Sequence, residues 1–161
     1  MKSFQFCRLV ALLSVLSALT SCGTAFRKAW KNAPGVKAAT HPHICLPLAP
    51  PPVAGRWDGT WHSEASGHRG RLRCVVSLPT NASGDHEFFY HATWMGFLSG
   101  GYKATHKVEK KGGSYVFKGQ HQMPAWAGGL YHYDGVIQGN EFKADYKSAA
   151  DHGTYTMKRV R

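Results

Sequence analysis

Several common catalytic signatures are missing from this 161-residue sequence. It contains no Gly-x-Ser-x-Gly nucleophile elbow, no His-Glu-x-x-His metal motif, no phosphate-binding loop and no dinucleotide fingerprint. These absences exclude the hydrolase, zinc-peptidase, nucleotidase and dinucleotide-dependent enzyme classes that rely on those motifs. We therefore favour a non-catalytic protein and expect no cofactor.

Acidic residues are also scarce: 9 Asp and Glu stand against 20 Lys and Arg, giving a net charge of +11. Such a balance favours anionic partners such as lipid headgroups, phosphate-bearing glycans or nucleic acid. Hydrophobic residues make up 43% of the chain and aromatic residues 12%, which is enough for a packed core.

Long hydrophobic runs are lacking, because the apolar segment at residues 9–20 is only twelve residues long. A membrane-spanning helix needs about 20. The run follows Lys2 and Arg8, and this order is typical of a secretory signal peptide. A buried core helix is the alternative. Export would remove the chain from nucleic acid, so we expect no nucleic-acid partner.

The run ends in Leu19-Thr20-Ser21-Cys22, which resembles the lipobox of bacterial lipoproteins. The resemblance implies cleavage before Cys22, so that residues 1–21 are the signal peptide, and a diacylglyceryl thioether on Cys22. No Asp follows the cysteine, which implies a lipid-anchored protein of the bacterial cell envelope, at the outer membrane and facing the periplasm.

Residues 22–54 are predicted to form a tether. Proline prevents helix and ladder hydrogen bonds and favours extended polyproline II structure. Six of the eight prolines lie here, at positions 34, 42, 47, 50, 51 and 52. Phe26 and Trp30 beside basic residues indicate either a short turn lying on a membrane or a solvated linker.

From Gly55 onward the chain reads as alternating apolar and polar runs separated by turn residues, which predicts strands. Closing such a meander into an eight-stranded antiparallel up-and-down barrel removes both sheet edges. We therefore predict an all-β barrel domain over residues 55–161. The run at 86–95 is apolar on both faces, which leaves its register open. The strands are expected at residues 56–64, 69–78, 86–95, 102–109, 114–122, 130–137, 141–148 and 154–161.

A membrane-embedded barrel is the rival architecture. Its outward positions would carry Arg71, Arg73, Lys103, Lys107, Lys143 and Lys147. Each would meet lipid at a cost of about 2–4 kcal/mol near the midplane. We therefore expect a water-soluble barrel held at the membrane by its lipid.

Gly55-Arg56-Trp57 opens the first predicted strand and Lys158-Arg159-Val160-Arg161 closes the last. The pair resembles the signature of the calycin group, which includes lipocalins, fatty-acid-binding proteins and avidins. The resemblance implies that Trp57 plugs one barrel end and that Arg159 stacks on it as a cation–π contact. Gly59-Thr60-Trp61 offers a second Gly-x-Trp, so the plug is not unique. GGLYHYDG and SAADHGTYTMKR also resemble a pattern in small exported bacterial proteins.

Polar aromatic residues at inward positions are the candidate ligand-binding residues. A lining of this kind suits a small ligand held by a few hydrogen bonds, but a barrel of eight strands can also be filled by its own side chains. The candidates are Tyr102, His106, Tyr115, His121, Tyr133 and Tyr146.

Three functions remain open. The first is a binding module for a small amphipathic or apolar molecule, which predicts a cavity. The second is a structural protein with a filled core, whose basic face, including Arg71, Arg73, Lys103 and Lys107, contacts an anionic envelope polymer. The third is a small isomerase or cyclase that uses His106 or His121 as its acid or base.

Two cysteines, Cys45 and Cys74, remain after processing. In an oxidising compartment they are candidates for a disulfide; the alternative is a reduced core residue and a free tether thiol. The sequence His41-Pro42-His43-Ile44-Cys45 has soft metal ligands but no evident fourth one, so we expect no metal site.

Overall fold

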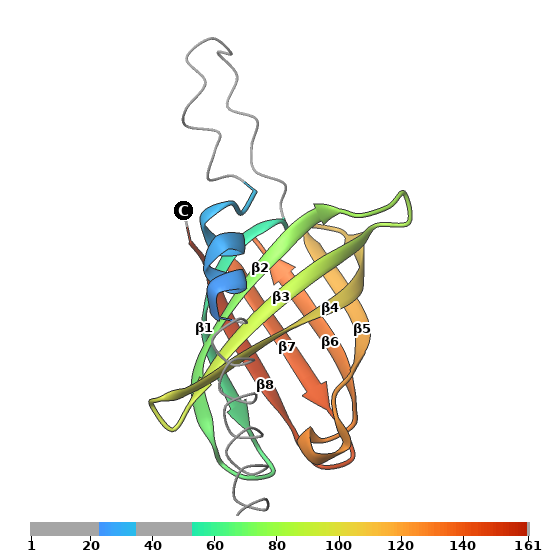
Figure 1. Cartoon of the computed structure of the whole chain (residues 1–161). Coiled ribbons are helices and arrows are strands. Elements are labelled where there is room, and N and C mark those ends of the chain that lie inside the picture. Colours follow the sequence, from blue (N-terminus) through green and yellow to red (C-terminus); the bar gives the residue numbers. More distant parts are fainter. Residues whose placement is uncertain (1–22, 35–52, 161) are drawn as a thin grey trace, which may run out of the picture.

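The protein is a closed antiparallel β-barrel in which each strand pairs with the next and β1 pairs with β8 (Figure 1). The computed structural model describes residues 23–34 and 53–160. The predicted eight-stranded up-and-down barrel is therefore confirmed. Its strands are β1 (Gly55–Ser63), β2 (Arg69–Pro79), β3 (Asp85–Trp94), β4 (Leu98–Lys111), β5 (Ser114–Gln122), β6 (Leu130–Gln138), β7 (Glu141–Lys147) and β8 (His152–Val160).

Strict alternation explains which side chains fill the interior. In β7, Phe142, Ala144 and Tyr146 are buried and the residues between them are exposed, as the period of two in a strand requires. The structure resolves the open register of β3: Phe88 and Tyr90 join the core cluster inside the barrel, whereas Phe89 belongs to a second cluster outside it.

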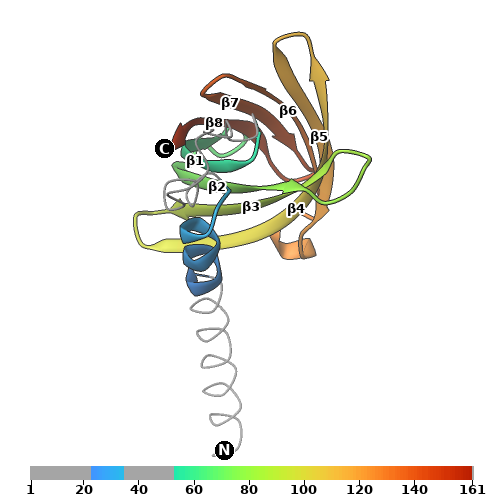
Figure 2. The same ribbon diagram turned by 90° about the horizontal axis from the view of Figure 1, so that it is seen from above.

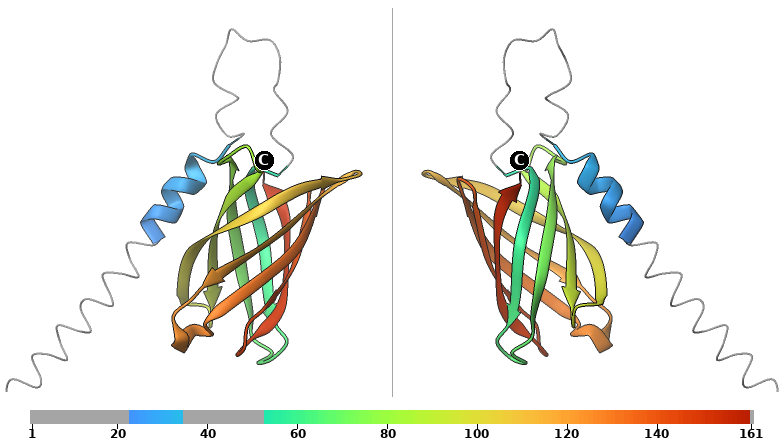
Figure 3. Two further views of the ribbon diagram at one scale, coloured as in Figure 1. Left: turned by 90° about the vertical axis from the view of Figure 1, so that its right-hand side faces the viewer. Right: turned by 90° about the vertical axis from the view of Figure 1, so that its left-hand side faces the viewer.

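The meander topology gives the barrel two distinct ends. The β1–β2, β3–β4, β5–β6 and β7–β8 connections lie at one end, which we name the far end. The plug end holds the other three connections, the start of β1 and the end of β8 (Figure 3). β4 begins at Leu98, four residues before the predicted start at 102, so residues 98–101 lie in a strand rather than a turn.

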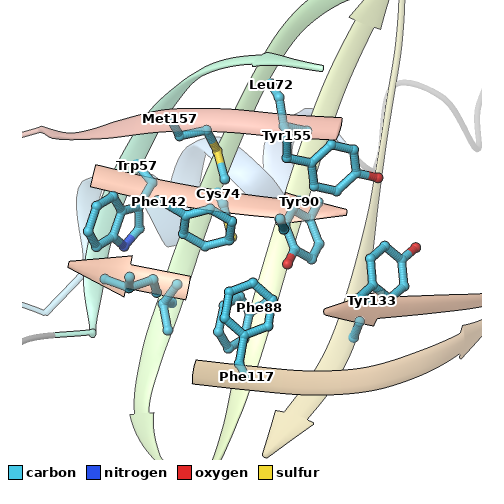
Figure 4. Packing of buried hydrophobic residues seen from close by; sticks show 14 of the residues in the cluster. Trp57, Leu72, Cys74, Phe88, Tyr90, Phe117, Tyr133, Phe142, Tyr155 and Met157 are labelled. Carbon is cyan, nitrogen blue, oxygen red and sulfur yellow. The ribbon is translucent and has the colours of Figure 1, made fainter. Parts of the chain in front are cut away.

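Large apolar side chains pack the half of the barrel nearest the plug end (Figure 4). Phe88, Phe117 and Phe142 are fully buried, and the Phe88–Phe117 and Phe117–Phe142 ring centroids lie 5.0 and 5.1 Å apart. Ring separations in this range are those of favourably packed aromatic pairs. This half of the core has no room between its rings for a large ligand.

A helix at residues 23–31 lies on the outside of β2 and β3 (Figure 2). Phe26 is only 1% exposed; its ring meets the edge of Phe89 at 5.2 Å and stacks on His91 at 4.8 Å. The helix thus covers outward apolar residues, including Val75, that would otherwise face water. This explains why the β3 sequence is apolar on both faces.

Arginines of the barrel wall complete this contact. The Arg73 guanidinium lies 5.3 Å from the Phe26 ring centroid and 5.5 Å from that of Trp30, and Arg56 lies 5.6 Å from Trp30. A guanidinium group placed over the face of an aromatic ring is attracted to it by a cation–π interaction. Residues 23–31 were predicted to belong to a tether, but they form a helix packed on the barrel.

Within residues 23–34 and 53–160, no helix combines the length and the hydropathy needed to cross a bilayer.

We predict that Phe26→Ala detaches the helix from the barrel. The change removes the central side chain of the contact, and losses of about 3 kcal/mol or more are usual for a buried Phe. Hydrogen exchange should show faster exchange in residues 23–31, with the barrel amides still protected. Lys31→Ala, at an exposed position of the same helix, is the matched control and should leave exchange unchanged. Equal exchange in the two variants would contradict the prediction.

Candidate functional site

Trp57 closes the plug end from inside the barrel. Its side chain is 0% exposed, and its indole N–H donates to the Val53 carbonyl at 3.0 Å. The Arg159 guanidinium lies 4.3 Å from the Trp57 ring centroid and donates to the Ala54 carbonyl at 2.8 Å. Because Trp57 and Arg159 are register partners in β1 and β8, this contact lies on the seam that closes the barrel.

The half of the interior nearer the far end is polar and aromatic. The Tyr133 hydroxyl donates to the Tyr102 oxygen at 3.0 Å, and the Tyr102 and Tyr155 hydroxyls share a hydrogen bond of 3.1 Å. Burial raises the pKa of Tyr133 to about 12 and raises those of Tyr102 and Tyr155 well above their usual value. These three hydroxyls are therefore neutral at any physiological pH and can both donate and accept hydrogen bonds.

His106 lies beneath this tyrosine cluster and is 0% exposed. Its Nε2 atom shares a 3.2 Å hydrogen bond with the Tyr90 hydroxyl, whereas its Nδ1 atom is buried without a hydrogen-bond partner. The ring fits only because residue 119 is glycine: a Cβ there would lie 2.0 Å from Nδ1. Burial, with a smaller contribution from His121, lowers the pKa of His106 to about 4, so the ring is neutral.

A second polar group lies closer to the far end. Asp151 accepts hydrogen bonds from the Ser63 hydroxyl at 2.6 Å and from the Tyr146 hydroxyl at 3.2 Å. Ser63 is 1% exposed although it ends β1. Burial and the neighbouring Asp151 carboxylate raise the pKa of Tyr146. Asp151 thereby ties the β7–β8 turn to β1.

Four half-buried side chains lie in the part of the barrel interior nearest the far end, which we name the mouth. They are Trp61, Tyr102, His121 and Tyr131. The His121 ring stacks on Tyr102 with centroids 5.1 Å apart, and partial burial lowers the pKa of His121. The Trp61 indole N–H donates a hydrogen bond to the Thr93 carbonyl at 3.0 Å. This end of the interior therefore combines aromatic rings with polar hydroxyl and imidazole groups.

The structure brings together five of the six predicted ligand-binding residues. Tyr102, His106, His121 and Tyr133 are joined by ring contacts, and Tyr146 stacks near them through Tyr155 at 4.9 Å. Tyr115 lies apart, because its register partner is Ile137, whose own partner in β7 is Phe142. That ladder leads to the apolar half near the plug end.

Sequence reasoning missed three members of the cluster: Tyr90, Tyr131 and Tyr155. Tyr131 and Tyr155 were detectable: Tyr131 lies two residues from the candidate Tyr133, and Tyr155 lies four residues, an even number, from Arg159, which was expected to stack on Trp57. Tyr90 could not be assigned from the sequence, because β3 is apolar on both faces and its inward face was ambiguous. The helix packed on the outside explains this pattern.

Cys74 is a free thiol inside the barrel and is 0% exposed. Burial raises its pKa well above the usual value, which makes it unreactive. Its predicted partner Cys45, the lipobox Cys22 and the His41–Cys45 motif lie outside the described residues. The disulfide therefore stays a prediction, and it requires residue 45 to reach a thiol enclosed by the strands.

Several basic residues on the barrel wall form ion pairs with acidic neighbours. Lys103 pairs with Glu87 at 2.9 Å, Lys107 with Glu109 at 2.9 Å and Arg71 with Asp58, and Arg73 lies under the helix aromatics. Exposed pairs of this kind add little stability, but they compensate the charge locally. In the described part of the chain, no cluster of three or more His, Cys, Asp or Glu residues is placed to hold a metal ion.

A groove of about 580 Å³ runs between the helix and the barrel wall. Apolar residues such as Ala29, Leu78 and Phe89 line it together with Lys28 and Lys103. The groove lies on the outside of the sheet, since Phe89 belongs to the cluster outside the barrel.

No protein-family model matches the chain, and no curated protein matches it. Among solved structures, the crystal structure of Echinococcus granulosus fatty-acid-binding protein 1 is similar over 68% of this chain and 98% of that chain, with 12% sequence identity and a TM-score of 0.37. At this identity the likeness concerns the fold alone.

We predict that His106 makes stability depend on pH. The folded pKa of about 4 lies below the usual 6.5, so the unfolded chain binds the proton first as the pH falls. The stability that the neutral ring contributes is therefore complete above about pH 6.5 and is lost between 6.5 and 4, at up to about 1.4 kcal/mol per pH unit. Denaturant unfolding of His106→Gln across this range should show a flatter profile.

His132→Gln is the matched control, because His132 is exposed on the outer face of β6. It should retain the wild-type slope. A wild-type slope in His106→Gln as well would contradict the assignment.

We also predict that Arg159→Ala lowers the free energy of unfolding by about 1–3 kcal/mol, because it removes the cation–π contact and a charged hydrogen bond. Thermal or denaturant unfolding measures the loss. Lys158→Ala, at the neighbouring exposed position, should change stability by less than about 0.5 kcal/mol. Equal effects would show that the Trp57 contact contributes nothing.

Proposed function

We propose that the protein is a lipid-anchored envelope lipoprotein whose barrel binds a small amphipathic or apolar molecule without catalysis. The ligand enters at the far end and rests its polar group on the tyrosine cluster. The observation that carries the proposal is the convergence of the Tyr102, Tyr133 and Tyr155 hydroxyls, at 3.0 and 3.1 Å, behind a half-buried mouth.

The contrast between the two halves of the interior supports this assignment. Near the plug end, packed rings of Phe88, Phe117 and Phe142 stabilise the fold without polar groups. Nearer the far end the barrel buries hydroxyl groups and an unpartnered His106 nitrogen, which lowers the free energy of unfolding. Buried polar groups weaken a core unless they serve recognition or are fully satisfied. A purely structural barrel gains nothing from them.

The two other candidate functions receive less support. A basic face for an anionic polymer is weakened by the acidic partners of Lys103, Lys107 and Arg71. An enzyme needs a histidine near a second polar group, and the His106–Tyr90 pair meets that need at 3.2 Å. Both side chains are 0% exposed, however, so the pair is enclosed beneath the cluster rather than offered to a substrate.

Binding is tested with the full chain and a fluorescent amphiphile, 11-(dansylamino)undecanoic acid. We expect one probe per barrel with a blue-shifted emission, because the dansyl group leaves water. Tyr102→Phe and Tyr133→Phe each remove one hydroxyl with almost no change in volume, and should weaken binding about two- to tenfold.

Tyr115→Phe is the matched control, since Tyr115 lies toward the plug end, and should leave the affinity unchanged. Native mass spectrometry of the chain isolated from its own host provides the second measurement, in which a bound small molecule is expected. A clean mass together with no probe uptake would overturn the binding proposal and favour the structural one.

The anchor is tested separately by the mass of the mature chain. Cleavage before Cys22 and two or three acyl chains on its amino and thiol groups are expected, and Cys22→Ser should release the protein from membranes. An unprocessed and unacylated chain would refute the anchor while leaving the binding proposal intact.

A further inference from the structure

Two loops at the far end of the barrel are apolar and almost fully exposed. The β3–β4 hairpin exposes 70% of Met95 and 77% of Phe97, and the β5–β6 connection exposes 89% of Trp126. Trp94, Leu98 and Leu130 add partly exposed apolar surface beside them. We name these six residues the apolar tips.

The surroundings of the apolar tips are uncharged. Residues 93–102 and 122–131 contain no Asp, Glu, Lys or Arg, although the chain as a whole has 29 such residues, the 20 basic and 9 acidic ones together. The other two connections at the same end differ, because Glu64 and Asp151 lie in them, and Arg69 and Lys147 lie at the adjoining strand ends. Exposed apolar groups in an uncharged setting mark a surface that meets another molecule.

The hairpin holds its apolar residues in place at a conformational cost. Trp94 and Leu98 are register partners, so the loop has three residues, and the first two have left-handed backbone: Met95 at φ 53° and Gly96 at φ 78°. Asn or Asp is the favoured residue at the first of these positions, and a long unbranched side chain there is uncommon. Backbone strain of this kind accumulates at functional positions.

The β5–β6 loop presents Trp126 on a rigid support. The loop is tied by its own backbone, through Ala127 N–H to Pro124 carbonyl at 2.9 Å and Met123 N–H to Gly129 carbonyl at 2.8 Å. The Tyr131 ring lies directly under it, where a Cβ on Gly128 would lie 2.5 Å from the Tyr131 hydroxyl. The indole is thus held outward rather than left loose.

The orientation of the helix at residues 23–31 also supports a contact at the far end. Its first residue is turned toward the far end of the barrel, whereas its last turn is nearer the plug end (Figures 1 and 3). Cys22, the residue proposed to carry the lipid, is joined directly to Gly23, the first helical residue. An anchor at that position favours a membrane on the side of the apolar tips.

We propose that the apolar tips insert into the interface of a lipid bilayer and orient the barrel with its mouth toward the lipid. Tryptophan and phenylalanine are the side chains that favour this interface, where an aromatic ring leaves water beside the headgroups. The proposal does not depend on the identity, or the existence, of a ligand in the barrel.

The test uses the full chain on phosphatidylcholine vesicles whose acyl chains are brominated, since bromine quenches only indoles that enter the bilayer. Trp126→Phe should remove at least half of the bromine-dependent quenching. Trp30→Phe, on the half-buried helix face against Arg73, should leave it unchanged. Quenching that is equal in wild type and Trp126→Phe would overturn the proposal.

Variants of the β3–β4 hairpin provide a second, independent test of bilayer insertion. Met95→Asn suits the left-handed turn better and should raise the unfolding temperature, yet it and Phe97→Ser should each reduce quenching at least twofold. Leu78→Ser, at an apolar position 51% exposed on the plug-end part of β2, is the control for loss of exposed apolar surface. Unchanged quenching in both hairpin variants would overturn the proposal.

A second copy of this chain is the competing occupant of the apolar tips. Sedimentation without vesicles decides between them: a dimer that Phe97→Ser converts to monomer, with no bromine quenching in wild type, would overturn the membrane proposal. A monomer in wild type and variants, together with quenching on vesicles, supports it.

Discussion

Pairing of β1 with β8 is the constraint on which the rest of the molecule depends. It turns an eight-stranded meander with two open edges into a cylinder, so that every strand has a neighbour on both sides. Trp57 and Arg159 face each other across this seam, and their contact seals the end at which the chain enters and leaves the barrel. Closure also creates an inside, without which neither core nor tyrosine cluster would exist.

The interior is divided along the barrel axis. Aromatic rings without polar atoms occupy the half next to Trp57, and tyrosine hydroxyls with His106 occupy the half next to the mouth. The first half supplies stability through close packing, which allows the second to contain buried polar groups that reduce it. The two halves are joined by Phe88 and Tyr90, which are alternate inward residues of β3, so the sheet itself couples the apolar half to the polar half.

Three features of the barrel lie at, or are turned toward, its far end. The helix at residues 23–31 covers β2 and β3, with its first residues turned toward the far end. The apolar tips and the half-buried mouth lie at that end as well. If both proposals hold, a lipid-derived ligand enters where the barrel touches the lipid, at the end opposite the Trp57 plug.

The sequence by itself determined the strands, the closed barrel and the inward positions of all six candidate residues, Tyr115 included, because a side-chain period of two is a local property that turn residues delimit. It also indicated the Trp57 and Arg159 pair through a short motif at each end of the domain. Tertiary structure decided the rest. The register of β3 depended on a helix that covers Phe89 and His91 from outside, and the separation of Tyr115 from the cluster depended on the stagger of β5 against β6. Neither is visible locally, because each arises from contacts between segments that are distant in the chain or offset along the barrel axis.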